Sequence, residues 1–531
     1  MIYQNNVIQS NSQNTNSICE VIQGVDTIRE KYLDYLKDES RLTGNVPERI
    51  YFPTSTDEVS QAIIDIKRRG ETVTISGART GIVGGAVSKN CKNILSLEKL
   101  VFTPQVFFNK QTNSWAVKVG AGTRLNELHK ILQKKKYTTN HPKPPHLMFP
   151  VDPTEQTASI GGNVSTNASG ARSFYYGPTR NWVQGLVVIL NDGSILRLSR
   201  NEIIAKNNIF LLKLSKKESF QEIYLPDLNI PDTKHVAGYN LKPNMDAIDL
   251  FIGSEGTLGI VSEVELKLCI PPKNMLYLVI FLPKCNYINI INDLKEADTI
   301  KIVAIEFMDS RSVNLLKKYR DNGGMTSEIP VIPKETEHIL YIEIILDDKI
   351  KEDTLHELDV ILENNNAGQS KTWAGFSKID LNKMKKFRHA LPSIINDIIT
   401  ERKKKIPSLT KIGTDMAVPK KQLDKIINLY ESTLKSLSLE YYIFGHIGDS
   451  HLHVNIIPNS IEQMHQAHQA YIQFAQKIVE YKGSVAAEHG IGRIKKQFLN
   501  IQFTKTEVKN MLILKKNFDP DSILNPSVLF T

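Results

Sequence analysis

The spacing of hydrophobic positions predicts helices and strands that alternate at the start of the chain. Apolar side chains recur at helical spacing over residues 25–36. They do so again over residues 59–66, where Thr56 is suited to cap the helix and Gly70 to end it. Residues 73–76 then form a short run of strand-forming side chains. Alternation of this kind is typical of the beginning of an α/β domain.

Strand patterns continue further along the chain and are interrupted once. Residues 183–190 and 195–198 are two apolar runs joined by a turn that contains Asp-Gly, which predicts a β-hairpin. Two consecutive prolines, Pro271 and Pro272, precede a new strand pattern over residues 276–282. We therefore expect a domain boundary near residue 272.

A histidine-rich segment lies between apolar flanks in the last fifth of the chain. Residues 448–450, Gly-Asp-Ser, have the chemistry of a turn. The segment therefore predicts a strand that ends at His446, a reversal, and a second strand that carries His451 and His453. This reversal is expected to bring His446 and His453 face to face.

These histidines, with a carboxylate further along, predict a metal site. Imidazole nitrogens and one carboxylate are a common ligand set for zinc or a similar divalent ion. His446, His453 and Glu488 would supply three ligands and leave one position open, which is typical of a catalytic metal. The alternative, packed or surface histidines without a ligand role, is less favoured because three of them occur in eight residues near Glu488 and His489.

A glycine-rich loop follows the strand at residues 73–76. Four glycines in nine positions leave backbone N–H groups without side chains in front of them, which suits a diphosphate. The loop lacks the ending of a Walker loop and the spacing of the dinucleotide fingerprint, so a flexible turn is an equal alternative on its residues alone. The candidate contacts are Ser76, Gly77, Ala78, Arg79, Thr80, Gly81, Gly84 and Gly85.

A second tract of small polar residues favours a cofactor. Residues 150–170 are rich in Gly, Ala, Ser, Thr and Asn, which pack poorly as a core but allow close backbone approach and offer many hydrogen-bonding groups. Residues 250–261 again combine glycines with a following strand. We expect a polar, flat molecule to bind along these segments.

Size and composition exclude several classes of protein. A chain of 531 residues with 41% hydrophobic and 23% charged residues is an ordinary globular protein of two or three domains. No run is apolar enough to span a membrane, and the four cysteines form no CxxC pair. The net charge of +9 comes from scattered lysines, so nucleic-acid binding is not expected. Residues 1–20 are expected to be a disordered lead-in rather than a targeting signal.

Taken together, the three glycine-containing segments and the histidine segments resemble the FAD-linked D-2-hydroxy-acid dehydrogenases. This family includes D-lactate dehydrogenases, the glycolate oxidase flavin subunit and D-2-hydroxyglutarate dehydrogenase, and belongs to the vanillyl-alcohol-oxidase-type flavoproteins. The resemblance covers the chain from about Arg49 to Phe530 in the family's order. It implies an α+β fold with a two-part FAD-binding domain over residues 21–271, a cap domain with an antiparallel sheet covered by helices over residues 272–490, and a return to the FAD domain over residues 491–531.

The resemblance also assigns roles to individual residues. The loop over residues 76–85 would hold the FAD pyrophosphate, and His446, His453 and Glu488 would bind the metal. His489 would remove the hydroxyl proton, and Arg388 and Lys411 occupy the places of cationic carboxylate binders, where a surface charge is nearly as good an interpretation. The remaining cofactor contacts would be Pro150, Asp152, Gly161, Gly162, Asn163, Thr166 and Gly170, with Gly259, Ile260 and Val261 near the adenine and Asn525 near the flavin.

Some features of the chain depart from the family. The first loop has no histidine, so we expect FAD to be bound without a covalent link. Many relatives have Gly-Asn where this chain has Ser450 and His451; His451 could be an extra ligand, a substrate contact or a surface residue, and we expect a surface residue. Iron–sulfur modules of longer relatives are missing, so a separate acceptor, a quinone, a cytochrome or an electron-transfer flavoprotein, would take the electrons.

The sequence thus predicts a metal-assisted FAD dehydrogenase that converts a D-2-hydroxy acid to the 2-oxo acid. D-lactate is the first choice of substrate, followed by D-2-hydroxyglutarate and glycolate. A cytoplasmic protein is expected, with peripheral contact to the inner face of a membrane and a homodimer both left open. Two alternatives are a metal hydrolase and a non-catalytic flavin-binding subunit of a larger oxidase.

Overall fold

The structure is a computed structural model, and it describes residues 19–110, 112–213, 220–284, 287–323, 328–368 and 371–530. The expected disordered lead-in lies outside the described residues as far as residue 18. The last residue of that segment, Glu20, already belongs to strand β1 (Glu20–Gln23), which pairs with β2 (Arg49–Phe52). The last two residues of the expected lead-in, Cys19 and Glu20, are therefore part of the described structure, and Glu20 is not disordered.

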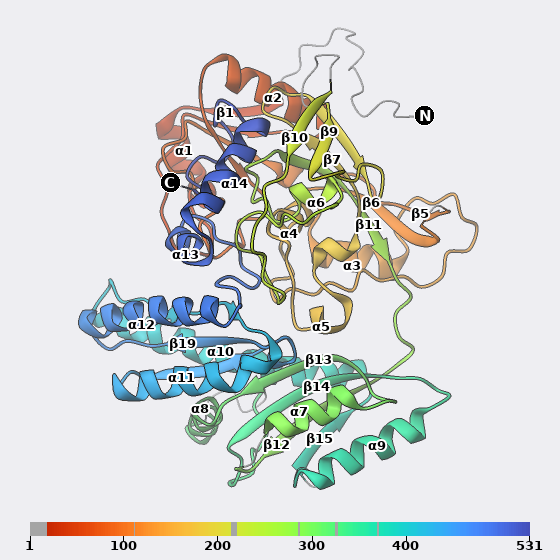
Figure 1. Cartoon of the computed structure of the whole chain (residues 1–531), viewed down its shortest axis with the longest axis vertical. Helices are drawn as coiled ribbons and strands as arrows, with labels where there is room; N and C mark the ends of the chain where they lie inside the picture. The colour runs from red at the N-terminus through yellow and green to blue at the C-terminus, as the bar shows by residue number, and fades with distance from the viewer. Residues whose placement is uncertain are drawn as a thin grey trace.

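The first half of the chain contains two larger sheets and a two-stranded sheet formed by β9 and β10. Both β9 and β10 are labelled in the upper part of Figure 1. One of the larger sheets has the strand order β1-β2-β4-β3, in which β4 pairs in parallel with both β2 and β3. The other larger sheet is antiparallel, with the order β5-β6-β11-β7-β8. The elements are β1 (Glu20–Gln23), α1 (Val25–Lys31), β2 (Arg49–Phe52), α2 (Thr56–Arg68), β3 (Val73–Ser76), β4 (Asn93–Ser96), β5 (Gln105–Asn109), β6 (Ser114–Gly120), α3 (Leu125–Lys134), α4 (Ile160–Thr166), α5 (Ser173–Tyr176), β7 (Val183–Ile189), β8 (Ile195–Ser199), β9 (Ile209–Leu212), β10 (Gln221–Tyr224), α6 (Ile248–Phe251) and β11 (Ile260–Leu268).

Two local predictions in this half need correction. The first helix ends at Lys31 and only a 3-10 turn follows at Leu33–Tyr35, where the Tyr35 ring packs edge-on against Phe52. The helix is short because it buries only Ile28. The cap of α2 is Ser55, whose hydroxyl accepts the Glu58 N–H, and Thr56 is the first helical residue.

The second half is built on one antiparallel sheet of eight strands. The path β15-β12-β14-β13-β18-β19-β16 is extended by β17, which also pairs with β19. Helices α7 to α12 accompany this sheet in the lower half of Figure 1. The elements are β12 (Asn274–Leu282), α7 (Tyr287–Glu296), β13 (Lys301–Met308), α8 (Ser310–Asp321), β14 (His338–Leu346), α9 (Lys351–Asn364), β15 (Thr372–Gly375), α10 (Lys378–Lys405), β16 (Ile412–Gly413), β17 (Met416–Ala417), α11 (Leu423–Ser436), β18 (Tyr441–Gly445), β19 (His451–Ile456), α12 (Ile461–Glu480), α13 (Lys496–Gln502) and α14 (Lys505–Phe518).

The end of the chain returns to the first half. Helices α13 and α14, drawn in blue, lie in the upper part of Figure 1 with the first half of the chain, where α14 contacts β10. Beyond α14, Val73 donates its N–H to Ile523 and accepts the N–H of Asn525, which extends the edge of β3. One buried hydrophobic cluster contains residues of both halves, from Val106 to Phe530. The two halves are therefore packed together through a common core.

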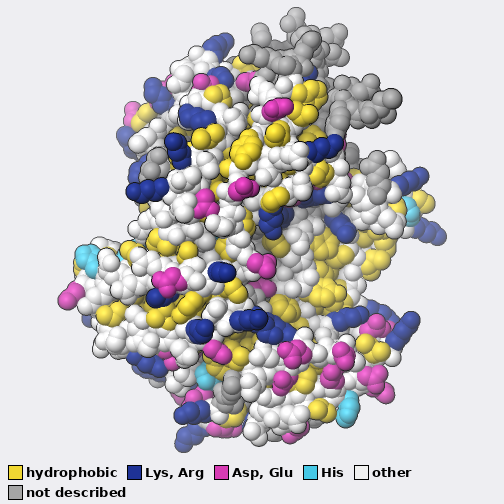
Figure 2. Space-filling model, viewed as in Figure 1, with side chains coloured by type: hydrophobic (Ala, Val, Ile, Leu, Met, Phe, Trp, Pro, Cys, Tyr) yellow, Lys and Arg dark blue, Asp and Glu magenta, His cyan; other side chains and the backbone are white. Residues whose placement is uncertain are grey.

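Two further predictions concern the distribution of charge on the surface and the absence of a helix that could span a membrane. In Figure 2, Lys and Arg side chains are interspersed with Asp and Glu side chains, as expected from scattered lysines. Within the described part of the chain, every helix is too short or too polar to cross a membrane.

Candidate active site

The histidine segment forms the predicted strand, turn and strand. Strand β18 ends at Gly445, Ser450 takes the left-handed conformation with φ of 53°, and β19 begins at His451. Gly445 is required here, because its φ is 128° and a Cβ would lie 2.9 Å from the His453 ring. The register pairs Phe444 with His453, and the rings of His446 and His453 lie 5.7 Å apart. The expected meeting of these two histidines is confirmed.

Three imidazoles converge on one carboxylate oxygen. Glu488 Oε1 lies 3.4 Å from the Nε2 atoms of His446, His453 and His489. In a tetrahedral site with bonds of about 2.1 Å, the ligand atoms are separated by about 3.4 Å. The distances of His446 Nε2 and His453 Nε2 from Glu488 Oε1 therefore fit a zinc-sized ion.

The far side of each predicted histidine ligand is held by a hydrogen bond. His446 Nδ1 lies 2.5 Å from Glu306 Oε1, and His453 Nδ1 lies 3.1 Å from the Thr414 carbonyl. A proton on each Nδ1 leaves the lone pair on Nε2, which faces Glu488. Metal-binding histidines are commonly oriented by such outer partners.

His451 is not the surface residue that we expected. Its side chain is 0% exposed, and it belongs with His446, His453 and Glu488 to a group whose ligand atoms all lie within 4.8 Å of one another. The reason is the period of the strand: His451 and His453 are two residues apart in β19 and therefore project from the same face.

Charge in the site is balanced by a buried lysine. Lys234 Nζ lies 2.9 Å from Glu488 Oε2 and 3.8 Å from Asp449 Oδ2. Burial would raise the pKa of Glu488, but Lys234 and His446 hold it well below its usual range. Burial would lower the pKa of His446, whereas the carboxylates of Glu306 and Glu488 raise it to about 9. Without a bound cation, the negative charges of these carboxylates therefore keep the His446 imidazole protonated.

Asp415 organises the turn that carries Glu488 and His489. Its carboxylate accepts both backbone N–H groups, at 3.2 and 3.1 Å, and the Lys495 ammonium at 2.7 Å. Its Oδ2 also lies 3.3 Å from His489 Nδ1. Burial would raise the pKa of Asp415, but His489 and Lys495 hold it well below its usual range. A charged Asp415 favours a proton on His489 Nδ1 and leaves Nε2 as the basic nitrogen.

The two predicted carboxylate binders have different surroundings. Arg388 Nε is 2.9 Å from Glu306 Oε2, and Glu306 also contacts His446, so Arg388 is one carboxylate away from the histidines. Lys411 Nζ is 2.8 Å from Asn396 Oδ1. Burial and the positive charge of Arg41 lower the pKa of Lys411 to about 8. Neither side chain is a simple surface charge.

The first two glycine-rich segments, residues 76–85 and 150–170, lie against each other. A Cβ on Gly77 would meet Ser159 Oγ at 2.6 Å, whereas a Cβ on Gly81 would have no neighbour within 4 Å. The Ser76 Oγ and Asn163 Nδ2 atoms are buried, one in each segment, and have no hydrogen-bond partner among the described residues. Unsatisfied polar atoms in a glycine-rich loop that is open at Gly81, and in the segment packed against it, fit a bound polar cofactor.

Other predicted cofactor contacts are engaged with the protein itself. Arg79 pairs with Glu98 at 3.1 Å, Asp152 lies 3.4 Å from Arg172, and Thr166 donates to the Gly162 carbonyl. Other residues among the predicted contacts are needed for close packing. The Cβ atoms that Gly161 and Gly170 lack would approach Ala121 and the Asp152 carbonyl at 2.7 and 2.1 Å, and Pro150, Ile260 and Val261 are buried.

Asn525 joins two of the predicted segments. Its Oδ1 accepts the Ile75 N–H at 2.7 Å, and its Nδ2 donates to the Glu255 carbonyl at 2.8 Å. Asn525 therefore holds β3 next to the third glycine segment, at residues 253–259. This is a structural role that the position of the residue in the sequence could not reveal.

The glycine segments and the histidine cluster are in direct contact. Ser169 Oγ lies 3.4 Å from Glu488 Oε2. Glu255, in the third glycine segment, accepts the N–H groups of Ile491 and Gly492, both at 2.8 Å. Cofactor loops and metal-type residues thus form one continuous site between the two halves of the molecule.

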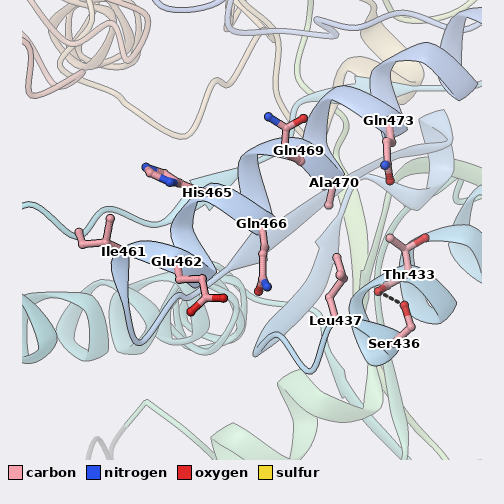
Figure 3. Close-up of a pocket in the computed structure, with 10 residues that line it drawn as sticks. All are labelled: Thr433, Ser436, Leu437, Ile461, Glu462, His465, Gln466, Gln469, Ala470 and Gln473. Carbon is pink, nitrogen blue, oxygen red and sulfur yellow. Dashed lines mark hydrogen bonds between the residues drawn. The ribbon is translucent and has the colours of Figure 1, made fainter.

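A surface groove of about 670 Å³ lies apart from this site (Figure 3). It runs between α11 and α12, and it shares no lining residue with the histidine cluster. Its walls are mostly Gln, Thr, Ser and His side chains, with Glu462 as the acidic member and Leu437, Ile461 and Ala470 as the apolar members. The groove offers no clustered catalytic groups, so the histidine cluster remains the candidate site.

Four functional-site residues were missed by the sequence interpretation: Lys234, Glu306, Thr414 and Asp415. Glu306 alone carried a usable signal, because a carboxylate between Ile305 and Phe307 in a buried strand requires a partner. The others come from segments that only folding brings next to Glu488.

The fold is that of a flavoprotein with an FAD-binding domain of the vanillyl-alcohol-oxidase type. Residues 47–199 match the family described as "FAD binding domain", and residues 271–529 match "FAD linked oxidases, C-terminal domain". The chain belongs to the FAD-linked oxidase family, with FAD as its cofactor and oxidoreductase as its class of activity. The sequence prediction of family and fold class is confirmed.

Known relatives span nearly the whole chain. A D-lactate dehydrogenase of Anaerostipes hadrus is 29% identical over 505 residues, covering 93% of this chain and 92% of that protein. A D-2-hydroxyglutarate dehydrogenase of Xanthomonas citri pv. viticola is 28% identical (93% and 92% covered), and glycolate oxidase subunit GlcD of Bacillus subtilis is 25% identical (94% and 92%). Among solved structures, alkyldihydroxyacetonephosphate synthase matches with a TM-score of 0.60 at 15% identity, covering 91% of this chain and 77% of that one. The last match concerns the fold alone.

Proposed function

We propose that this protein is an FAD-dependent dehydrogenase that oxidises a D-2-hydroxy acid, with D-lactate as the first candidate substrate. The carrying observation is the convergence of three imidazole nitrogens on Glu488 Oε1, in contact with the cofactor loops through Ser169. Relatives named for D-lactate, D-2-hydroxyglutarate and glycolate support the substrate class.

Each part of the chain has a role in this proposal. Residues 21–271 bind FAD without a covalent link, residues 272–490 form the cap with the substrate and metal site, and residues 491–531 return to the FAD domain. Bound FAD supplies the acceptor for the hydrogen on C2 of the substrate. The open space at Gly81 and the unsatisfied Ser76 Oγ and Asn163 Nδ2 atoms support cofactor binding here.

His446, His453 and Glu488 hold a divalent ion in this proposal. Such an ion would make the substrate hydroxyl proton easier to remove, as metal ions lower the pKa of bound water from about 15.7 to about 7. Glu306 and Thr414 orient the two histidines through their Nδ1 atoms. Lys234 holds Glu488 in place through its second oxygen.

His489 is the general base in this mechanism. Its Nε2 faces the same point as the metal-type ligands, 3.4 Å from Glu488 Oε1, and its side chain is 30% exposed, so a substrate can reach it. Asp415 keeps the proton of the resting imidazole on Nδ1, and Nε2 takes the hydroxyl proton. Asp415 then stabilises the imidazolium that results.

Cationic groups bind the substrate carboxylate. Arg388 keeps its Nε on Glu306, which places the guanidinium one carboxylate away from His446. In this proposal its other N–H groups bind the substrate carboxylate. Lys411 is the second binder. The electrons leave for a separate acceptor, a quinone, a cytochrome or an electron-transfer flavoprotein.

An anaerobic absorbance spectrum tests the proposal. Purified protein would be mixed in turn with D-lactate, D-2-hydroxyglutarate, glycolate and the L-enantiomers of the two chiral acids. Bleaching of the flavin bands by one of these acids, and for a chiral acid by its D form alone, is the expected result. Flavin bands that none of the acids bleaches would contradict the proposal, and a protein without flavin bands would favour a metal hydrolase.

A further inference from the structure

We propose that His451 is a fourth protein ligand of the ion, so that three imidazoles and one carboxylate hold it. This inference rests on the metal site of the proposed function and adds a ligand to it. It concerns a residue whose place in the sequence marked it only as a departure from the family pattern.

The first support is the burial of an imidazole with unmet hydrogen-bonding needs. His451 is 0% exposed, and neither of its ring nitrogens makes a well-directed hydrogen bond to a described residue. Asp415 Oδ1 lies 3.1 Å from Nε2, but the direction of the N–H is poor. One carboxylate can serve only one of the two nitrogens, so the other needs a further partner. A buried polar group without a partner is costly, and an ion would remove that cost.

The second support is the position of the ring. His451 lies on the same face of β19 as His453, and the centroids of their rings are 4.6 Å apart. The His446 ring is 5.3 Å away. One ligand atom from each of these three histidines and one from Glu488 all fall within 4.8 Å of one another. A single ion can therefore be shared by all four after small adjustments of the side chains.

The third support is a comparison with His489, the other histidine near Glu488. His489 is 30% exposed and has a charged partner at Nδ1, so it can meet water or substrate with Nε2. His451 is closed off from solvent and can meet only what the site contains. This difference assigns His489 to the substrate and His451 to the ion.

Four protein ligands have a measurable consequence. They fill a tetrahedral shell without water, and catalytic zinc sites can expand to five ligands when a substrate enters. The resting site of this chain would therefore differ from a site with two imidazoles, one carboxylate and an open position. The visible spectrum of bound Co²⁺ reports this difference, because its intensity depends on coordination number and ligand type.

The test uses full-length protein stripped of metal and titrated with Co²⁺ against a coloured chelator. The His451→Asn variant is compared with the wild type and with His468→Asn, a change at an exposed histidine on α12. We expect His451→Asn to weaken Co²⁺ binding by at least about 100-fold, since outer partners of a ligand are already worth about 10- to 100-fold. Its FAD content should equal that of the wild type, and His468→Asn should change neither property.

X-ray absorption of the metal site counts the imidazoles directly, in the wild type and in His451→Asn. Three imidazoles that fall to two in the variant support the inference, whereas two in the wild type, or three in both proteins, overturn it. Equal Co²⁺ affinity and equal spectra in His451→Asn and wild type would also overturn it, while the metal site of the proposed function would stand. Wild-type protein that binds no Co²⁺ would remove the metal site and this inference together.

Discussion

The cofactor loops and the histidine cluster meet in one site but are built on opposite principles. The loops use glycine and small residues, and their packing depends on missing side chains, as at Gly170, where a Cβ would lie 2.1 Å from the Asp152 carbonyl. The cluster uses buried charged side chains, each oriented by another, as Glu306 orients His446. One region presents backbone to a ligand, and the other presents side-chain atoms.

Because of this difference, we expect FAD binding to depend on the loops and the reaction to depend on the histidine cluster. Substitutions in the cluster should leave FAD in place and remove the reaction, because the cluster touches the loops only at contacts such as Ser169 with Glu488. The following predictions test that separation.

The largest effect among single substitutions is expected at His489. His489→Ala should lower the rate of flavin reduction by the substrate about 10²- to 10⁴-fold, the usual worth of a positioned general base. FAD and metal contents should stay at wild-type values, because His489 is not among the proposed ligands. Stopped-flow absorbance with substrate, and dithionite as the control reductant, measures the effect. An unchanged rate would exclude His489 as the base.

The Asp415→Asn substitution tests the residue that orients His489, and its expected effect on the rate is smaller. An amide keeps the shape of Asp415 but loses the charge that favours the Nδ1 proton of His489, so the rate should fall about 10- to 100-fold. The pH profile of the rate should shift as well, which a purely structural defect would not cause. A slower reaction with an unshifted profile would contradict the orienting role.

The smallest effect concerns Lys411 and pH. Because burial and Arg41 lower its pKa to about 8, Lys411 loses its positive charge as the pH rises through that value. If the charged form binds the substrate carboxylate, KM should rise about tenfold between pH 7 and pH 9, as the charged fraction falls by that factor. Lys411→Met should remove this dependence, whereas Lys425→Met, at an exposed position on α11, should retain it. The same rise in KM in both variants would argue against Lys411.

The fold was predictable where local patterns determine the structure. The hairpin of β7 and β8 followed from Asp-Gly between two apolar runs, and the boundary near Pro272 precedes β12, the first strand of the eight-stranded sheet. The end of the first helix was not predictable, because packing of Tyr35 on Phe52, seventeen residues away, turns the chain there.

The site was predictable only in part. His446 and His453 meet through a short turn, so their spacing was informative. Lys234 and Asp415 reach Glu488 and His489 from 254 and 74 residues away, and their neighbours in the sequence contain no sign of that contact. His451 was misjudged for a different reason, since the period of two in a strand already places it beside His453.

The most direct test of the account is flavin reduction in protein stripped of its metal by a chelator. Stripped and Zn²⁺-restored samples with equal FAD would be mixed anaerobically with the D-acid that bleaches the native flavin fastest. The account predicts that dithionite reduces both samples equally, whereas the acid reduces only the restored one at an appreciable rate. Equal reduction of both by the acid would show that the histidine cluster does not act through a metal, and would contradict the central claim.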